Sequence, residues 1–404
     1  MKHLKFIFAF IFFALILTIT GCPVETYEVT IYEPVYLSYE ELRSSVNIST
    51  TKELKNIGKI AIKDNYLFVN QINKGIHIID NKDPKNPVNK SFINIPGNID
   101  LVIKDNILYA DSFIDLVAID ISDLTNDKIN VTKRINNTFI YDPYQIILKT
   151  NSWYVYFENI DMTKGVVIDW KERKETRTRP IGVFFGVYVT TKDSGTSVNG
   201  SMSRFAIYSN YLYTVSNNDM KVFDITTTNN PAFWAKINMN WGIETIFPYN
   251  DKLFIGSRTG MYIYDNNNPA NPVQLSQLLH VRSFDPVVVE NNYAYVTLRG
   301  FINQLDVIDI SDMAKPVLKN SYAMAAPYGL GIENSILFIC DNGLKIYDAK
   351  DPLNLKLIKF IPEISSYDVI PYQSKLTLTG SKGIYQYDYS DINNIVLLSQ
   401  IPII

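Results

Sequence analysis

The sequence predicts an all-β fold built from repeats, because three observations agree. A short apolar phrase that ends in Asp recurs along most of the chain. A second short run of β-branched or aromatic residues precedes each copy. No segment sustains a 3.6-residue period with capping signals, which excludes a helical solenoid.

Eight phrases that end in Asp define eight repeats. They are GIHIID (Asp80), DLVAID (Asp120), GVVID (Asp169), MKVFD (Asp224), MYIYD (Asp265), LDVID (Asp309), LKIYD (Asp348) and IYQYD (Asp388). Successive anchors are 40, 49, 55, 41, 44, 39 and 40 residues apart. This interval matches one blade of a β-propeller, whereas a β-helix would repeat at a shorter interval.

Each repeat contains four short strands. The second strand is a run such as NYLFV (65–69) or KLFIG (252–256), and another apolar run such as KIAIK (59–63) precedes it. The Asp phrase is the third strand, and a run such as VNKSFINI (88–95) is the fourth. The sequence therefore predicts a propeller of eight blades, each with four short antiparallel strands. The alternative is seven, if the Asp169 repeat is not a full blade.

Two further features concern closure and the turns. Residues 51–57 read as a spare strand that could pair with the last blade and close the ring. The anchor Asp residues are expected to accept hydrogen bonds from the turn that follows, and Pro84 or Pro352 then fixes that turn. A calcium site is the alternative, but the residues after Asp80 and Asp265 do not follow the D-x-[DN]-x-[DN]-G pattern.

The N-terminus predicts a membrane anchor. Lys2 and Lys5 precede a 15-residue apolar segment (6–20), which is typical of a signal peptide and short for a membrane span. The segment ends in Ile19-Thr20-Gly21-Cys22, which resembles a bacterial lipobox. That resemblance implies cleavage before Cys22 and lipidation of its sulfur, while the alternative is an ordinary secretory signal with an incidental Cys. Pro23 replaces the Asp that often retains lipoproteins at the inner membrane, which favours an outer-membrane lipoprotein, periplasmic or surface-exposed.

The predicted organisation is a signal peptide (1–21), a tether (22–50) and one propeller (51–404) with a long insertion at about 181–203. The net charge of −3 gives no electrostatic basis for nucleic-acid binding. The two cysteines cannot form a disulfide framework, and Cys340 is expected to be an inert core thiol. No HExxH, GxSxG or CxxC motif is present, so no catalytic residue, metal or cofactor is predicted.

Residues 58–123, which include Leu116-Val117-Ala118-Ile119-Asp120, resemble the LVIVD-repeat lipoproteins of the bacterial cell envelope. Residues 200–205 (GSMSRF) also resemble a short motif of that group. The resemblance implies a propeller fold and a lipid anchor. It brings no established reaction, so no catalytic residues can be transferred.

Strand direction predicts which end of the propeller binds a ligand. The connections from second to third strands, and from each fourth strand to the next first strand, share one face, and the insertion also falls there. Nine residues near these connections form the predicted ligand-binding set: Gln71, Asn98, Asp100, Asp111, Asp115, Asp161, Ser201, Arg204 and Arg258. The alternative role of the Asp residues is turn capping. The basic cluster 171–179 is expected to be an exposed edge strand, with an anion or lipopolysaccharide contact as the alternative.

These observations favour a non-enzymatic binding module for a glycan, a peptide or an envelope protein. The first alternative is a hydrolase or lyase for a glycan or peptide, with titratable side chains converging in the channel. A second alternative is a scaffold for an envelope complex, with an apolar patch on the blade edges.

Overall fold

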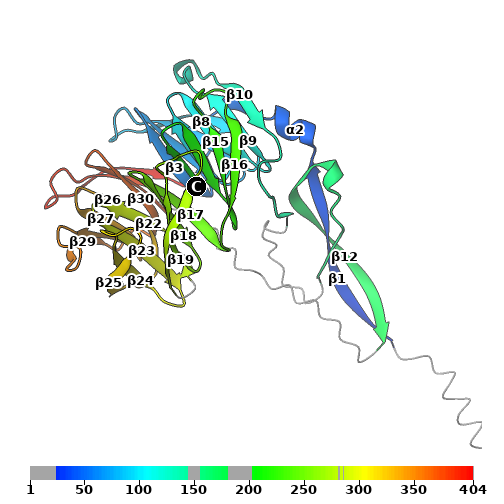
Figure 1. The fold of residues 1–404 in the computed structure, drawn as a ribbon. Coiled ribbons are helices and arrows are strands. Elements are labelled where there is room, and N and C mark those ends of the chain that lie inside the picture. Colours follow the sequence, from blue (N-terminus) through cyan, green and yellow to red (C-terminus); the bar gives the residue numbers. More distant parts are fainter. Residues whose placement is uncertain (1–23, 144–154, 181–202, 281–282, 285, 404) are drawn as a thin grey trace, which may run out of the picture. The chain divides into compact units, whose positions relative to one another are not determined.

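The computed structural model describes residues 24–143, 155–180, 203–280, 283–284 and 286–403 (Figure 1). The chain divides into two compact units. Unit 1 comprises the described parts of Met1–Glu41 and Asp142–Gly195, and unit 2 comprises those of Leu42–Tyr141 and Thr196–Ile404. The short helix α2 (Tyr39–Ser44) contains the boundary between them.

Unit 2 contains seven antiparallel sheets in its described residues, each made of strands consecutive in sequence. Sheet 1 comprises β3 (Ile57–Lys63), β4 (Tyr66–Gln71), β5 (Gly75–Asp80) and β6 (Val88–Asn94), and β2 (Asn47–Thr50) pairs with β6 as a fifth strand. Sheet 2 comprises β7 (Leu101–Lys104), β8 (Ile107–Ser112), β9 (Asp115–Asp120) and β10 (Asn130–Ile135), with the 3-10 turn η1 (Leu124–Asn126) between the last two. Sheet 3 comprises β13 (Phe205–Tyr208), β14 (Tyr211–Val215), β15 (Asp219–Asp224) and β16 (Ala232–Asn238).

The other four sheets repeat this order. Sheet 4 comprises β17 (Ile243–Tyr249), β18 (Lys252–Ser257), β19 (Gly260–Asp265) and β20 (Val273–Leu279). In sheet 5 two short strands, β21 (Ser283–Phe284) and β22 (Val287–Glu290), pair with β23 (Tyr293–Gly300), followed by β24 (Gln304–Asp309) and β25 (Val317–Ala323). Sheet 6 comprises β26 (Pro327–Glu333), β27 (Ile336–Asp341), β28 (Leu344–Asp348) and β29 (Lys356–Ile361). Sheet 7 comprises β30 (Ser366–Tyr372), β31 (Lys375–Gly380), β32 (Gly383–Asp388) and β33 (Val396–Pro402).

The all-β repeat fold is confirmed, and the blade count is seven. The preferred count of eight is wrong, because the Asp169 phrase belongs to β12 (Val166–Pro180), which pairs with β1 (Val24–Leu37) in unit 1. Residues 155–180 therefore fold outside the propeller that was predicted to span 51–404. The Asp169 phrase has the composition of a third strand, but it forms part of a long antiparallel ribbon because β1 pairs with β12 along its whole length.

The seven anchor Asp residues of unit 2 confirm the turn-capping interpretation. Each carboxylate accepts a hydrogen bond from the backbone N–H two residues further along the chain. The donor–acceptor distance is 3.0 Å for Asp80 and 2.8 Å for Asp120. These aspartates therefore shape the turn between the third and fourth strands, as short polar side chains commonly do.

Seven hydrophobic clusters hold neighbouring sheets together, one at each interface. Successive side chains of a second strand point to opposite faces of the sheet, so one strand contributes to two clusters. Phe68 of β4 packs toward sheet 2, while Leu67 packs toward sheet 7. The strands are apolar on consecutive positions because both faces of each sheet are covered. The first strands of successive sheets contact one another, which places them innermost in the ring (Figure 1).

The ring closes by side-chain packing. Ile384 of sheet 7 lies in one cluster with Leu54, Ile57 and Leu67. The side chains of Asn81 and Gln386 also exchange two hydrogen bonds, of 2.9 and 2.7 Å. The predicted closing strand at 51–57 is wrong: residues 51–56 form no strand, and the added strand β2 pairs with sheet 1 instead.

Unit 1 is a three-stranded sheet in the order β11-β1-β12, with β11 at Val155–Phe157. The basic cluster lies in β12 at the edge of this sheet, as predicted. Its Arg173 forms ion pairs with Glu33 (2.6 Å), Glu175 (2.9 Å) and Glu158 (3.0 Å). Because these groups are well exposed, solvent screens the ion pairs and they contribute little to stability.

Candidate functional site

Strand pairing defines an equivalent position at the start of each first strand. Ile60, Leu101 and Phe205 each pair with the fourth residue of the second strand in their sheet. One residue of the first strand does the same in each of the other sheets. The residue immediately before each of these is named here a member of the inner ring. The inner ring comprises Lys59, Asp100, Arg204, Thr245, Pro286, Gly329 and Asp368.

Charge is confined to four consecutive members of the inner ring. These are Asp368, Lys59, Asp100 and Arg204, from sheets 7, 1, 2 and 3. The other three positions are uncharged, and a Cβ on Gly329 would lie 2.4 Å from Asp368 Oδ1. Glycine at this position therefore leaves space for the Asp368 carboxylate.

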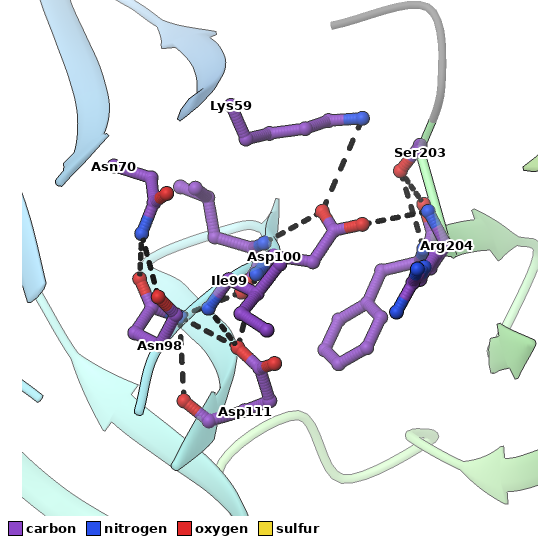
Figure 2. A network of polar contacts seen from close by, with 10 residues as sticks. Lys59, Asn70, Asn98, Ile99, Asp100, Asp111, Ser203 and Arg204 are labelled. Atoms are coloured by element: carbon purple, nitrogen blue, oxygen red, sulfur yellow. Dashed lines mark hydrogen bonds and ion pairs between the residues drawn. The ribbon is translucent and has the colours of Figure 1, made fainter. Parts of the chain in front are cut away.

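Lys59 is the buried cation of the inner ring. Its Nζ lies 3.9 Å from Asp100 Oδ1, and both side chains are more than nine-tenths buried. Burial lowers the pKa of Lys59, while the negative charges of Asp100 and Asp368 oppose that shift. Figure 2 shows the Asp100 carboxyl group between Lys59 and the backbone of Arg204.

A second set of contacts holds the loop between β6 and β7. Asp111 Oδ1 accepts hydrogen bonds from Asn98 Nδ2 (2.8 Å), Ile99 N (2.8 Å) and Asp100 N (3.0 Å) (Figure 2). Asn70 Nδ2 of sheet 1 donates to Asn98 Oδ1 at 2.7 Å and so joins the two sheets. Burial raises the pKa of Asp111 to about 7, although these hydrogen bonds favour its ionised form.

Arg204 presents its side chain differently from the other charged members of the inner ring. Its backbone N–H donates to Asp100 Oδ2 at 2.6 Å, so its main chain is held by the neighbouring sheet. Its guanidinium group is exposed. Among the described residues, no carboxylate lies within ion-pair distance of it.

The structure brings Asn98, Asp100, Asp111 and Arg204 of the predicted set into one network (Figure 2). Gln71 lies at the end of β4 on the same face of the propeller, and its Oε1 is 2.9 Å from His77 Nε2. His77 is fully buried, and burial lowers its pKa to about 4. We name this end of unit 2, which carries the β4–β5 turn, the β4–β5 face.

Asp115 and Asp161 have structural contacts. Asp115 is buried and lies 3.2 Å from both Arg43 and Arg134, so it ties the start of β9 to α2 and β10. Asp161 is predicted on the propeller face, but its segment belongs to unit 1 and not to the propeller unit. There it caps the short 3-10 turn η3 (Met162–Lys164) and accepts from Thr163 N at 3.0 Å.

Three of the predicted features remain untested. Cys22 and Ser201 lie outside the described residues, and so does most of the insertion at 181–203. Cys340 is a buried free thiol whose pKa is raised by burial, in line with the expected core position. The described residues contain no group of three or more His, Cys, Asp or Glu side chains suited to a metal ion.

Sequence reasoning missed Lys59, Asp368 and Asn70. The signal was available, because aligning the eight repeats on their first strands places Lys59 and Asp368 at the same position as Asp100. Alternation along one strand does not show which residues face the axis of a closed ring, so the pattern of a single repeat does not identify them.

Aromatic side chains and arginines accumulate on the β4–β5 face. The guanidinium of Arg258 lies 5.6 Å from the ring centroid of Trp241, which is 46 % exposed, and it also pairs with Glu244 at 2.8 Å. In sheets 5 to 7, the guanidinium of Arg299 lies 4.2 Å from the Tyr328 ring, which in turn meets Tyr367 edge to face. Exposed apolar side chains on the same connections are Ile99, Phe301 and Ile302.

Comparison with known proteins supports the repeat assignment. The LVIVD repeat matches residues 56–94, 199–237 and 282–324. These segments correspond to sheets 1, 3 and 5, so one repeat is one four-stranded sheet. Three of the seven sheets are therefore similar to the LVIVD repeat, and the repeats together form a β-propeller. A search of curated proteins finds no significant match.

Several solved structures share the fold at low sequence identity. A putative 6-phosphogluconolactonase from Bacteroides uniformis has a TM-score of 0.53 and 10 % identity, over 89 % of this chain and 97 % of that one. BamB from Moraxella catarrhalis has a TM-score of 0.52 and 7 % identity, over 90 % and 99 %. A functionally unknown protein from Desulfotomaculum acetoxidans has a TM-score of 0.50 and 11 % identity, over 86 % and 96 %. At these identities the similarity concerns the fold alone.

No helix among the described residues has the length and apolar character needed to cross a membrane.

Proposed function

We propose that the protein is a lipid-anchored, non-enzymatic binding module of the outer membrane, periplasmic or surface-exposed. Its ligand is an envelope or extracellular glycan, peptide or protein, and the β4–β5 face is the binding surface. The observation that carries this proposal is the accumulation of aromatic side chains and arginines on that face, with the exposed Trp241 beside the half-buried Arg258 and the half-buried Tyr328 beside Arg299. Aromatic and arginine side chains are the residues most enriched at binding hot spots.

Capture from envelope extracts tests the binding surface. Wild-type protein is compared with a Trp241→Ala, Phe301→Ala double variant and with Tyr372→Ala. Tyr372 is 50 % exposed and ends β30 at the opposite end of the propeller, so it is a matched control for loss of an exposed aromatic side chain. A ligand retained by wild type and Tyr372→Ala but lost by the double variant supports the proposal. Equal retention by all three proteins would contradict it.

The anchor is tested separately by metabolic labelling with palmitate. The lipobox-like Ile19-Thr20-Gly21-Cys22 motif supports lipidation at Cys22. Wild-type protein should incorporate label and fractionate with the outer membrane, whereas Cys22→Ser should lose both properties. Label that persists in Cys22→Ser would reject this attachment site.

One observation favours a hydrolase or lyase as the second candidate. The carboxyl group of Asp111 has a pKa raised to about 7 and lies beside the buried Lys59–Asp100 pair, conditions under which a general acid or base operates. Turnover of envelope glycans or peptides by wild type, abolished in Asp111→Asn, would establish the enzyme. Turnover that survives this substitution would exclude Asp111 as its acid or base.

A further inference from the structure

Arg204 is the charged member of the inner ring that faces solvent. The ammonium group of Lys59 is buried beside Asp100, and the guanidinium of Arg258 pairs with Glu244. The guanidinium of Arg204 is exposed, with no carboxylate at ion-pair distance among the described residues. The inner ring therefore presents a positive charge at the β4–β5 face.

The main chain at Arg204 is fixed on both sides. Its N–H donates to Asp100 Oδ2 at 2.6 Å, and the neighbouring Ser203 Oγ contacts both the N–H and the carbonyl oxygen of Phe205. Asp100 is itself held, because its Oδ1 accepts from Leu101 N at 2.8 Å and lies near Lys59 Nζ. Since the backbone is already ordered, ligand binding has to order the Arg204 side chain but not its main chain.

The Asp100 carboxylate forms no ion pair with the guanidinium of Arg204. Its contacts are with Lys59 and with the backbone N–H groups of Leu101 and Arg204. The planar guanidinium is therefore available for a carboxylate from outside the chain, with which it can form two parallel hydrogen bonds.

Exposed apolar side chains lie on the same face of the propeller. Ile99 precedes Asp100 in the network and is 40 % exposed (Figure 2). The β23–β24 turn of the same face exposes Phe301 and Ile302, by 83 % and 38 %. Exposed apolar side chains of this kind can bury the apolar side chains of a peptide.

We infer that the ligand of the β4–β5 face is an acidic peptide segment that also carries apolar side chains, with one of its carboxylates bound by Arg204. This inference rests on the proposed binding function and names its ligand class. Charge supplies the specificity for Asp or Glu, and burial of the apolar side chains supplies additional affinity.

Fluorescence anisotropy with defined probes tests the inference on the full-length protein in detergent micelles. The probes are a labelled peptide of Glu, Leu and Phe, the same peptide with Gln in place of Glu, and labelled polygalacturonate as an acidic glycan. The Glu peptide should bind, and the Gln peptide should bind roughly tenfold more weakly or worse, as expected for loss of a charge-assisted hydrogen bond. Equal affinity for the two peptides would overturn the inference.

Two variants assign the carboxylate contact. Arg204→Gln should weaken binding of the Glu peptide roughly tenfold and leave the Gln peptide unaffected. Lys85→Gln removes the same charge from an exposed β5–β6 turn at the opposite end of the propeller, and it should bind like wild type. Unchanged affinity in Arg204→Gln would overturn the inference, and thermal melting checks that each variant is folded.

The outcomes separate this inference from the function on which it rests. If polygalacturonate binds wild type but not Arg204→Gln, and the Glu peptide does not bind, the ligand is not a peptide. The proposed binding function then still holds. If the Trp241→Ala, Phe301→Ala variant loses capture from envelope extracts but none of the three probes binds wild type, only the acidic-peptide ligand is overturned. Envelope capture that is insensitive to that double variant contradicts the proposed binding surface itself.

Discussion

Two carboxyl groups of neighbouring strands show how position decides the role of an aspartate. Asp100 faces the buried ammonium of Lys59, and removing one member of such a pair typically costs about 3–5 kcal/mol because a charge remains buried. Asp111 instead accepts three hydrogen bonds from the loop that contains Asp100. One aspartate therefore balances a charge, while the other shapes the loop that presents it.

The raised pKa of Asp111 predicts a pH-dependent stability. Its folded-state pKa of about 7 lies above the value near 4 expected in the unfolded chain, so its contribution to stability is present at low pH and lost as pH rises through 7. Asp111→Asn keeps an acceptor oxygen but does not titrate. Between pH 5 and 8 the variant should gain roughly 2 kcal/mol in free energy of unfolding relative to wild type, measured by urea denaturation.

Asp83→Asn is the matched control for this prediction. Asp83 is exposed, and its hydrogen bond with Asn86 lowers its pKa, so it is ionised throughout this pH range. The difference between Asp83→Asn and wild type should therefore stay constant from pH 5 to 8. Parallel pH curves for wild type and Asp111→Asn would show that Asp111 does not titrate in this window.

At the scale of elements, edge strands distinguish sheet 1 from the other sheets of unit 2. The outer strand β6 is covered by β2, in which Ile48 pairs with Ile93 and packs against the cluster between sheets 1 and 2. The outer strands of other sheets expose apolar side chains, including Phe233 and Trp234 of β16. An uncovered strand edge is a template for pairing with another chain.

Disrupting β2 should therefore promote association. An Ile48→Pro, Ser49→Pro variant removes both possible ladder donors at the centre of β2, and we expect a loss of about 1–3 kcal/mol in free energy of unfolding. Light scattering should detect more oligomer than in wild type, because β6 adds a further uncovered edge. Thr51→Pro, just beyond the strand, is the control and should remain monomeric to the same extent as wild type. An unassociated double variant would mean that the β6 edge is not exposed.

At the scale of the whole propeller, the interface between sheets 7 and 1 resembles every other interface. Each sheet is made of consecutive strands, so no strand exchange joins the two ends of the ring. Closure depends on the cluster around Ile384 and on the reciprocal Asn81–Gln386 hydrogen bonds. Because neighbouring sheets bury one another's side chains, unit 2 should unfold as one cooperative unit.

Truncating the closing side chain tests this view. Ile384→Ala should cost about 2–5 kcal/mol and increase hydrogen exchange most in β3 and β32, which flank the closing interface. Leu344→Ala, at the equivalent position of sheet 6, should cost a similar amount but affect β28 and β30 instead. If Ile384→Ala left protection in sheets 1 and 7 at the wild-type level, closure would not depend on this packing.

The sequence by itself determined the strands, the turns and the repeat, because each depends on residues close together in the chain. An apolar run followed by Asp forms the same third strand in all seven sheets, and in each the Asp caps the turn that follows. The predicted set also contained four members of the polar network, since strand direction already placed their connections on one face.

Tertiary structure alone decided the number of blades, the closure and the composition of the inner ring. The Asp169 phrase satisfies the repeat pattern, yet it pairs with β1, a partner more than a hundred residues away that no local pattern identifies. Lys59 and Asp368 lie over three hundred residues apart in sequence and meet only when the last sheet packs against the first. Side-chain packing between distant strands, which periodicity does not encode, therefore decided how the site is assembled.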